Sequence, residues 1–355
     1  MDYTLIIKIT NNCNLNCAYC YHRRDISRHQ YETMSYDMIE CLIKEVLYHN
    51  NERATFIWHG GEPLLVGKDV FRFIVAKQKE HNVKNLQIRN NIQTNGTLLD
   101  AEYIQLLKEH GFHIGISIDG PFELHAKERN TSLPEYENIE KSLSYLHRVN
   151  ARYGTLCVVG KHHIGQEKKI LDFLMSHNIQ NIGFLPCVVQ SSGVVDEEQT
   201  ISPTEYAQFL VNLFDGWINS KIKSLSVRNF DDAIRFALNI PAKSCTKSNC
   251  CDEYLTIAPD GKIYLCDDFS ASDEHCVGHI EEGLEFIENT SAMQWLKRAM
   301  KMQPETCRKC KYYNGCFGGC KYRRWIRNND MSEGSYYCKS TQILYSHVEK
   351  CLAKE

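Results

Sequence analysis

The chain has 355 residues, of which 43% are hydrophobic and 24% charged, an ordinary composition for a globular protein with a large core. A formal net charge of −3 provides no basic surface for a phosphate backbone, so we expect no nucleic-acid partner. No stretch approaches the roughly 20 apolar residues of a membrane helix, and the first residues, MDYTLIIKIT, lack the pattern of a signal peptide, so we expect a cytoplasmic protein without a membrane partner.

Six β-rich apolar runs alternate with amphipathic segments up to about residue 230. The expected strands are Thr4–Thr10, Thr55–Trp58, Asn85–Asn91, Phe112–Ser117, Gly154–Val159 and Asn181–Leu185. Apolar residues recur at helical spacing in Tyr36–Leu47, Val70–His81, Ala101–His110, Tyr136–Val149, Glu167–His177 and Thr204–Ile218. This order predicts an α/β fold with parallel strands and crossover helices, either an open doubly wound sheet or a partial barrel.

The pattern changes near residue 240, where short segments rich in glycine, aspartate, tyrosine and cysteine replace the regular alternation. A strand–turn–strand is expected from Tyr254–Ile257 to Lys262–Cys266, around the turn Pro259-Asp260-Gly261. We therefore expect a larger domain at residues 1–230 and a small cysteine-rich domain at residues 231–355 that ends in a helix.

The chain contains 17 cysteines, of which three lie within the first 20 residues and most lie from Cys245 onward. Because a reducing cytoplasm disfavours disulfides, this number points to metal binding. Cys13, Cys17 and Cys20 follow the first expected strand. Three thiolates can bind a cubane iron–sulfur cluster and leave its fourth iron open to a small chelating ligand. The alternative is a structural zinc site with His22 as the fourth ligand.

The motif Cys13-x3-Cys17-x2-Cys20 resembles the signature of the radical S-adenosylmethionine (SAM) superfamily. The resemblance implies a partial (β/α)6 TIM-like barrel with its active site at the carboxyl ends of the strands. It also implies that SAM chelates the open iron and is cleaved to a 5′-deoxyadenosyl radical when the cluster is reduced. The turns after three expected strands would contact SAM, through Gly60, Gly61, Glu62, Gln93, Asn95, Ser117 and Asp119. Without the resemblance, these segments are ordinary turns between a strand and a helix.

The C-terminal cysteines resemble the auxiliary-cluster domain called SPASM. By this resemblance the cluster nearer the active site is held by Cys245, Cys251, Cys266 and Cys320, and the outer cluster by Cys307, Cys310, Cys316 and Cys338. Three 4Fe-4S clusters would then use eleven cysteines. A zinc ribbon is the alternative for the second set, and Cys250 is the alternative to Cys251. The remaining cysteines are interpreted as small buried or incidental thiols: Cys41, Cys157, Cys187, Cys276 and Cys351.

Over nearly the whole chain the sequence is similar to anaerobic sulfatase-maturating enzymes, which oxidise a Cys or Ser side chain of a sulfatase to formylglycine. The segments Leu156–Val159, Tyr206–Asp215 and Asp260–Asp267 carry much of this similarity. In that family an aspartate directly after the third auxiliary ligand is the proposed base, and Asp267 occupies this position. The implied partners are a peptide or protein substrate and an electron donor such as flavodoxin or ferredoxin.

The sequence departs from this family at two positions that we assign to the substrate site. His22 replaces a frequent tyrosine, and His59 replaces a common glutamine before the Gly-Gly-Glu motif. Residues 129–137 also lack the expected Asp-rich stretch. A maturase of ribosomally made peptides, which forms a crosslink, a thioether, an epimer or another modified side chain, is therefore the alternative function. A non-catalytic iron–sulfur or zinc scaffold is a third possibility.

Overall fold

The computed structural model describes residues 2–21, 32–191, 194–220, 224–328 and 330–353. They form two compact units, each made of several chain segments. The first unit comprises Met1–Ser117, Arg129–Tyr153 and Asp252–Arg298, and the second comprises Ile118–Glu128, Gly154–Cys251 and Ala299–Glu355. The domain boundary between residues 230 and 231 stays a prediction.

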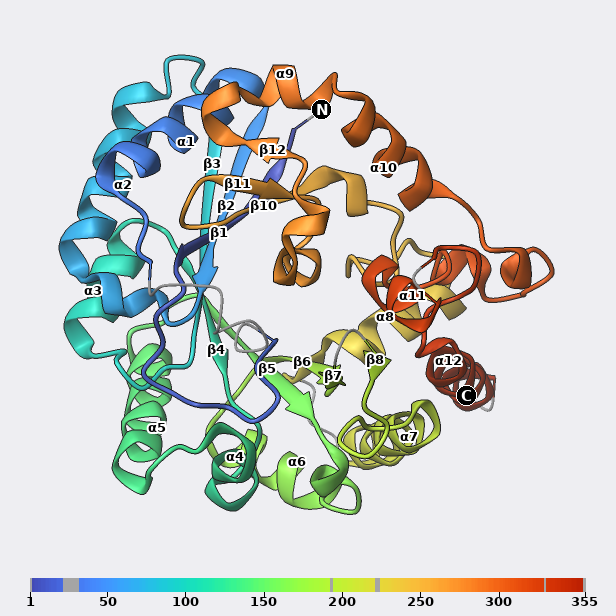
Figure 1. Ribbon diagram of the computed structural model, residues 1–355. Coiled ribbons are helices and arrows are strands. Elements are labelled where there is room, and N and C mark those ends of the chain that lie inside the picture. The colour runs from blue at the N-terminus through green and yellow to red at the C-terminus, as the bar shows by residue number, and fades with distance from the viewer. Residues whose placement is uncertain (1, 22–31, 192–193, 221–223, 329, 354–355) are drawn as a thin grey trace. The chain divides into compact units, whose positions relative to one another are not determined.

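The first unit contains a mostly parallel sheet with the strand order β12-β11-β10-β1-β2-β3-β4. Only β11 runs against its neighbours β10 and β12. The strands are β1 (Thr4–Thr10), β2 (Arg53–Gly60), β3 (Gln87–Thr94), β4 (His113–Ser117), β10 (Tyr254–Ile257), β11 (Lys262–Tyr264) and β12 (Gly278–His279). The helices are α1 (Tyr36–His49), α2 (Lys68–His81), α3 (Ala101–Glu109), α5 (Leu133–Arg148) and α9 (Leu284–Glu288). Helices α1, α2, α3 and α5 lie along one side of strands β1 to β4 (Figure 1).

Local sequence signals explain where these helices begin. The Ser35 side chain accepts a hydrogen bond from the Met38 amide at the start of α1, whose buried residues recur three or four positions apart. Helix α5 starts at a reciprocal cap between Ser132 and Glu135. The predicted alternation of strands and helices is confirmed.

The predicted hairpin around Asp260 forms, but its first strand also joins the sheet of the first unit. Strand β10 pairs in parallel with β1, from Thr4 opposite Tyr254 to Ile7 opposite Ile257. Strand β1 therefore has a partner on each side, with β2 on the other, and its backbone groups are satisfied as in a central strand.

The second unit contains three parallel strands in the order β5-β6-β9, at β5 (Tyr153–Val159), β6 (Asn181–Pro186) and β9 (Ser226–Val227). A small ribbon pairs β7 (Gln190–Ser191) with β8 (Val194–Val195). Its helices are α4 (Phe122–Arg129), α6 (Glu167–Ser176), α7 (Pro203–Asn219), α8 (Arg228–Ala237), α11 (Lys321–Asn328) and α12 (Cys338–Leu352). Helix α10 (Ser291–Lys301) contains the point where the first unit ends and the second resumes.

Helix α12 packs against α7 and α8 around a core of aromatic rings. The Phe214 and Phe230 ring centroids lie 5.2 Å apart with the rings edge to face, and those of Phe184 and Phe209 lie 5.5 Å apart. No helix in the described part of the chain is long and apolar enough to cross a membrane.

Candidate active site

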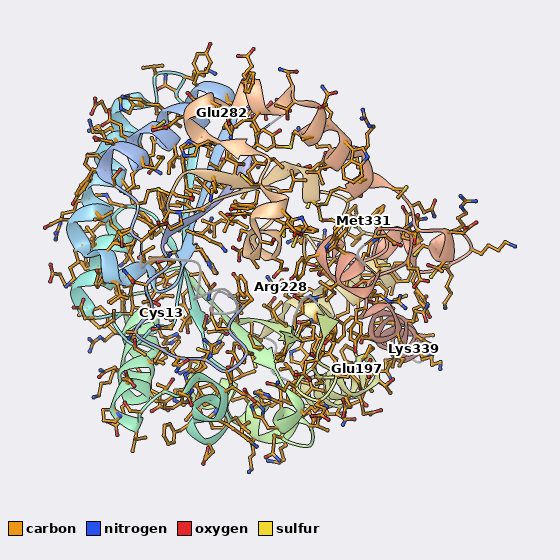
Figure 2. All side chains as sticks on the ribbon, viewed as in Figure 1. Cys13, Glu197, Arg228, Glu282, Met331 and Lys339 are labelled. Atoms are coloured by element: carbon orange, nitrogen blue, oxygen red, sulfur yellow. The ribbon has the colours of Figure 1, made fainter. Side chains whose placement is uncertain are left out.

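The first cysteine loop begins where β1 ends, and Cys13 lies in it (Figure 2). The Cys13 sulfur accepts a backbone hydrogen bond from Leu15 at 3.5 Å and faces the Asn95 amide at 3.9 Å. Burial raises the pKa of the Cys13 thiol, and the neighbouring Glu62 carboxylate and Cys20 thiol raise it further. A bound metal cation would favour loss of this thiol's proton, which fits a cluster ligand.

The Gly60-Gly61 turn holds the end of β2 against this cysteine loop. The Gly61 amide donates to Thr10 O and the Glu62 amide to Asn12 O, each at 2.7 Å. A Cβ atom on Gly61 would lie 2.0 Å from Asn12 O, and one on Gly60, whose φ is +124°, would lie 2.2 Å from Thr10 O. Only glycine permits this approach of two backbones, so the motif has a steric reason at both positions.

The Glu62 side chain is buried and links the loops after β2 and β3. Its carboxylate accepts hydrogen bonds from Thr94 Oγ1 at 2.7 Å, the Asn95 amide at 2.7 Å and the Leu64 amide at 3.0 Å. Burial nevertheless raises the pKa of Glu62 to about 7, since the hydrogen bonds only partly offset the loss of solvation. The carboxylate therefore orders the loops, and its assigned contact with SAM stays a proposal.

The other residues assigned to SAM fall into two sets. The Asn95 side-chain amide donates to Asn14 Oδ1 at 2.9 Å, and Gln93 Nε2 donates to the Ser117 hydroxyl at 2.9 Å. These residues thus meet at the carboxyl ends of β3 and β4, and Asn95 links this edge to the cysteine loop. Asp119 belongs to the second unit, where it is buried and accepts a hydrogen bond from the Val158 amide at 2.9 Å.

Asp267 begins a short 3-10 helix, Asp267–Ala271, directly after Cys266 in the first unit. Its Oδ1 atom lies 3.2 Å from Lys8 Nζ, and its Oδ2 atom accepts a hydrogen bond from the Tyr21 hydroxyl. The Lys8 ammonium also donates to the Ser270 hydroxyl and lies 5.3 Å from the Tyr21 ring centroid. The base predicted from the sequence is therefore held by a cation and a phenol.

His59 is half-buried near this group. Burial lowers the pKa of His59, and the Lys8 ammonium lowers it further against the opposing effect of Asp267. The imidazole is therefore neutral at neutral pH. The second predicted substrate residue, His22, lies outside the described residues.

Sequence analysis missed Lys8 and Tyr21. A signal for Lys8 was present, because a lysine inside the apolar strand TLIIKIT must find a partner if the strand is central. Tyr21 had no comparable signal, since it follows Cys20 in a loop.

The four thiols assigned to the outer cluster lie together in the second unit. Burial raises the pKa of Cys307 and of Cys338, and the thiols of Cys310 and Cys316 raise both further. A Cβ atom on Gly334 would lie 3.5 Å from Cys307 Sγ and 3.7 Å from Cys338 Sγ. Four thiols gathered in this way, one buried and three half-buried, fit a shared cationic cluster.

Three thiols assigned to the nearer cluster also converge. Burial raises the pKa of Cys251, and Cys320 and Cys245 raise it further. Cys250 instead contacts the Ser248 hydroxyl at 2.9 Å, which supports Cys251 as the ligand. The fourth predicted ligand, Cys266, belongs to the first unit. Three cations lie within electrostatic range of these two sets of thiols and would offset the charge of tetrathiolate clusters: Lys247, Lys321 and Arg324.

Comparison with known proteins agrees with this arrangement. The radical SAM superfamily model matches residues 7–174, and the SPASM iron–sulfur cluster-binding domain model matches residues 245–311. The cysteine-type anaerobic sulfatase-maturating enzyme of Clostridium perfringens is 30% identical over 97% of this chain and 96% of its own length. The serine-type enzyme of Bacteroides thetaiotaomicron is 26% identical over 98% of this chain and 89% of its own length.

Solved structures extend the similarity to the fold. Native anSMEcpe with bound AdoMet and Cp18Cys peptide has a TM-score of 0.86 and 27% identity, covering 99% of this chain and 98% of that chain. Streptococcus suis SuiB bound to its precursor peptide SuiA has a TM-score of 0.66 at 14% identity, covering 94% of this chain and 75% of that chain, which shows the shared fold alone.

These findings confirm the partial barrel, the SAM and 4Fe-4S cofactors and the additional clusters of the SPASM domain. They also argue against the zinc ribbon and the non-catalytic scaffold. The chain belongs to the radical SAM enzymes with a SPASM domain, within the family of the anaerobic sulfatase-maturating enzymes.

Proposed function

We propose that this radical SAM enzyme oxidises a cysteine or serine side chain of a sulfatase to formylglycine. The observation that carries the proposal is the position of Asp267, which follows the auxiliary ligand Cys266 and is held by Lys8 and Tyr21. Similarity to relatives with this activity over 97% of the chain supports it. The cysteine-type relative is 30% identical and the serine-type relative 26%, so a cysteine target is favoured.

Asp267 accepts the proton of the target thiol or hydroxyl in this proposal. The Lys8 ammonium at 3.2 Å stabilises the carboxylate, which is the form that can take a proton. The Tyr21 hydroxyl donates a hydrogen bond to the other carboxylate oxygen and fixes its orientation. When bound, SAM would supply the radical that removes a Cβ hydrogen atom, and the auxiliary clusters would accept the remaining electron. A serine then gives the aldehyde directly, whereas a cysteine gives a thioaldehyde that water hydrolyses to the aldehyde with release of hydrogen sulfide.

The protein residues would also bind and order the cofactors. Cys13, Cys17 and Cys20 hold the first cluster, and the backbone of the Gly60-Gly61 turn, Glu62, Gln93, Asn95, Ser117 and Asp119 form the SAM site. His59 is assigned to the substrate as a neutral hydrogen-bonding group, and His22, which lies outside the described residues, is assigned there from the sequence alone. From the family resemblance of the sequence, Cys245, Cys251, Cys266 and Cys320 are assigned to the nearer auxiliary cluster, and Cys307, Cys310, Cys316 and Cys338 to the outer one.

The test is anaerobic turnover with SAM, a strong reductant and a peptide that contains the cysteine-type sulfatase motif. Mass spectrometry should show the mass change of thiol to aldehyde, and a hydrazide probe should label the product. The serine peptide compares the two target types, and a peptide with alanine at the target position is the control. Cleavage of SAM without an aldehyde in either peptide would reject the proposal, and a crosslinked or epimerised precursor peptide would support the alternative maturase.

We also propose that a flavodoxin or ferredoxin supplies the electron and that the protein works in the cytoplasm. Seventeen thiols, eleven of them assigned to clusters, would be oxidised in a compartment that forms disulfides. Reduced flavodoxin should replace the chemical reductant in the same assay. Failure of both flavodoxin and ferredoxin to support turnover would contradict this choice of donor.

A further inference from the structure

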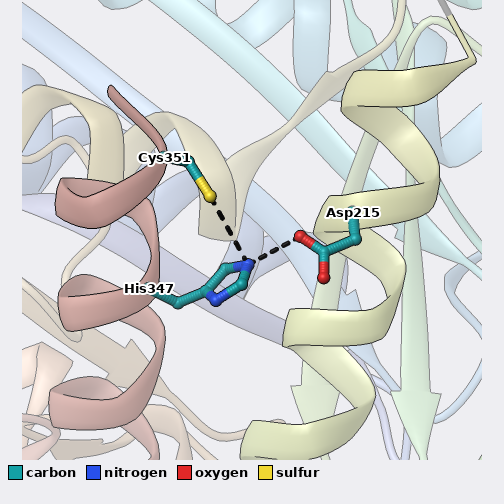
Figure 3. Close-up of side chains that lie close together, drawn as sticks. All are labelled: Asp215, His347 and Cys351. Carbon is teal, nitrogen blue, oxygen red and sulfur yellow. Dashed lines mark hydrogen bonds and ion pairs between the residues drawn. The ribbon is translucent and has the colours of Figure 1, made fainter. Parts of the chain in front are cut away.

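A cluster of three potential metal ligands, none of them an assigned cluster ligand, lies where α12 packs against α7. His347 and Cys351 are four residues apart on α12 and therefore share one face of that helix. Asp215 faces them from α7 (Figure 3). The carboxylate oxygen, the imidazole nitrogen and the sulfur all lie within 4.8 Å of one another.

Both contacts of His347 are made by the same ring nitrogen. Nε2 lies 2.6 Å from Asp215 Oδ1 and 3.6 Å from Cys351 Sγ. A nucleophile–histidine–carboxylate triad needs the thiol on one ring nitrogen and the carboxylate on the other. The arrangement therefore does not fit thiol activation, whereas three donor atoms around one point fit a metal ion.

The surroundings hold the imidazole in place and leave it accessible. The Phe214 ring packs edge to face against His347, with the centroids 5.8 Å apart. On α12, Leu344, Tyr345 and Val348 are buried beside the cluster and fix the helix. The side chains of His347 and Asp215 are 28% and 48% exposed, so a water molecule can reach a fourth position.

The charge of Asp215 is also available to a metal ion. Throughout the part of the chain that the structure describes, its carboxylate pairs with His347 and with no lysine or arginine. A second group, Glu40, Glu80 and His81, is different. There the Glu40 carboxylate already pairs with the ammonium groups of Lys44 at 2.9 Å and Lys77 at 3.1 Å.

We propose that Asp215, His347 and Cys351 bind one zinc ion, with water as the fourth ligand. Sulfur, imidazole and carboxylate donors together match the ligand preference of Zn²⁺. Metal–ligand distances of about 2.0 to 2.3 Å place tetrahedral ligand atoms about 3.3 to 3.6 Å apart. The distance of 3.6 Å between Cys351 Sγ and His347 Nε2 already has this value. The distance of 2.6 Å between His347 Nε2 and Asp215 Oδ1 must increase as the metal replaces the proton that these two atoms share. Binding displaces the thiol proton of Cys351 and leaves His347 neutral.

The zinc ion would link α7 to α12, whose first residue, Cys338, is assigned to the outer cluster. This proposal differs from the interpretation of Cys351 as an incidental thiol, because Asp215, the ligand from the other helix, lies more than a hundred residues earlier in the chain.

The test compares the zinc content of the wild type, Cys351→Ala and Cys41→Ala. Each protein is produced in zinc-containing medium, purified anaerobically and loaded with its iron–sulfur clusters. Plasma mass spectrometry should find about one zinc per wild-type chain, and Cys351→Ala should lose at least nine tenths of it with its iron content unchanged. Cys41→Ala is the matched control, since Cys41 is also a partly exposed helical cysteine outside the cluster sets, and it should keep its zinc. Equal zinc in the wild type and Cys351→Ala would overturn the proposal.

X-ray absorption at the zinc edge distinguishes this site from zinc that has entered a vacant cluster site. One sulfur scatterer with nitrogen and oxygen neighbours is expected, whereas four sulfur neighbours would refute the assignment. If Cys351→Ala does not fold, Asp215→Asn provides the same test, since it removes the charge and keeps the side-chain shape. Asp215→Asn should lower zinc retention under a chelator at least tenfold, and unchanged retention would contradict the proposal.

Discussion

Lys8 Nζ lies 3.2 Å from Asp267 Oδ1, which joins the first strand of the chain to the residue that follows Cys266. The Lys8 side chain is only 7% exposed, and that of Asp267 is 18% exposed. Because an ion pair shielded from water is stronger than one at the surface, we expect Lys8 to affect the chemistry of the proposed base.

Replacing Lys8 with Met should slow product formation at least about tenfold, because the Asp267 carboxylate loses its cation. SAM cleavage in the absence of peptide should be unchanged, and Lys8→Arg should restore part of the rate. Peptide mass spectrometry and chromatography of 5′-deoxyadenosine measure the two reactions separately. A full product rate in Lys8→Met would show that the ion pair has no role in turnover.

Replacing Asp267 with Asn should reduce product formation by about a hundredfold or more, since the amide cannot accept the substrate proton. The variant should still cleave SAM and bind the peptide. Asp268→Asn is the matched control, because it changes the next carboxylate along the chain. A wild-type product yield from Asp267→Asn would remove its role as base.

The buried Glu62 carboxylate should make stability depend on pH. The pKa of this group rises from 4.5 in the unfolded chain to about 7 in the folded protein, so the folded state binds more protons between these values. Its contribution to stability is full below pH 4.5 and is lost as the pH rises through 7. In SAM-free protein, the free energy of unfolding of the wild type should therefore fall by about 3 kcal/mol relative to that of Glu62→Gln as the pH rises through this range. Anaerobic chemical unfolding measures the difference, and parallel pH curves would contradict it.

Gly61→Ala should weaken SAM binding at least about tenfold, because the new methyl group would meet the Asn12 backbone and separate the two loops. Gly67→Ala is the control, since a Cβ atom there meets no neighbour within 4 Å although its φ of +88° is unfavourable. Anaerobic equilibrium dialysis with SAM compares the three proteins. Equal affinity in Gly61→Ala would show that the loops can separate without affecting the site.

Fully reconstituted protein should contain about twelve irons, by the count of three cubane clusters. Cys316→Ala should contain about eight, because the outer cluster loses one of four ligands, and it should retain SAM cleavage without peptide. Cys276→Ala, a cysteine outside the ligand sets, should keep the full iron content. Zinc without iron in strictly anaerobic wild-type protein would contradict the cluster assignment.

The repeating α/β part of the fold was predictable because its signals are local. Strand β1 and the first hairpin strand match the expected ranges, and most helices end within a few residues of their expected bounds. Helix α11 was not predicted, because Lys321–Asn328 is dominated by charged residues. Its residue Arg324 is 1% exposed and donates to the backbone oxygens of Met302 and Glu333. A buried arginine of this kind depends on partners that a local pattern does not contain.

In the candidate site, too, the local motifs were predictable and the contacts between distant segments were not. The Cys13-x3-Cys17-x2-Cys20 and Gly60-Gly61-Glu62 motifs are each continuous in sequence, and together with the spacing of the later cysteines they carried the family resemblance that implied the cofactors. The contacts of Asp267 with Lys8 and Tyr21, and of Asp215 with His347, join distant segments. Such contacts follow from the packing of the elements and need the structure.

The parallel pairing of β10 with β1 determines how reproducibly the reacting groups are spaced. The cysteine loop extends from one of these strands, and the hairpin that starts with β10 leads to Asp267. Their backbones are in fixed register from Thr4 to Ile7. A shift of this register by one residue would turn the strand's side chains to the opposite face and carry Lys8 away from the carboxylate. Proton acceptor, cation and cluster loop are thus spaced by a ladder of peptide hydrogen bonds, which tolerates little variation in length.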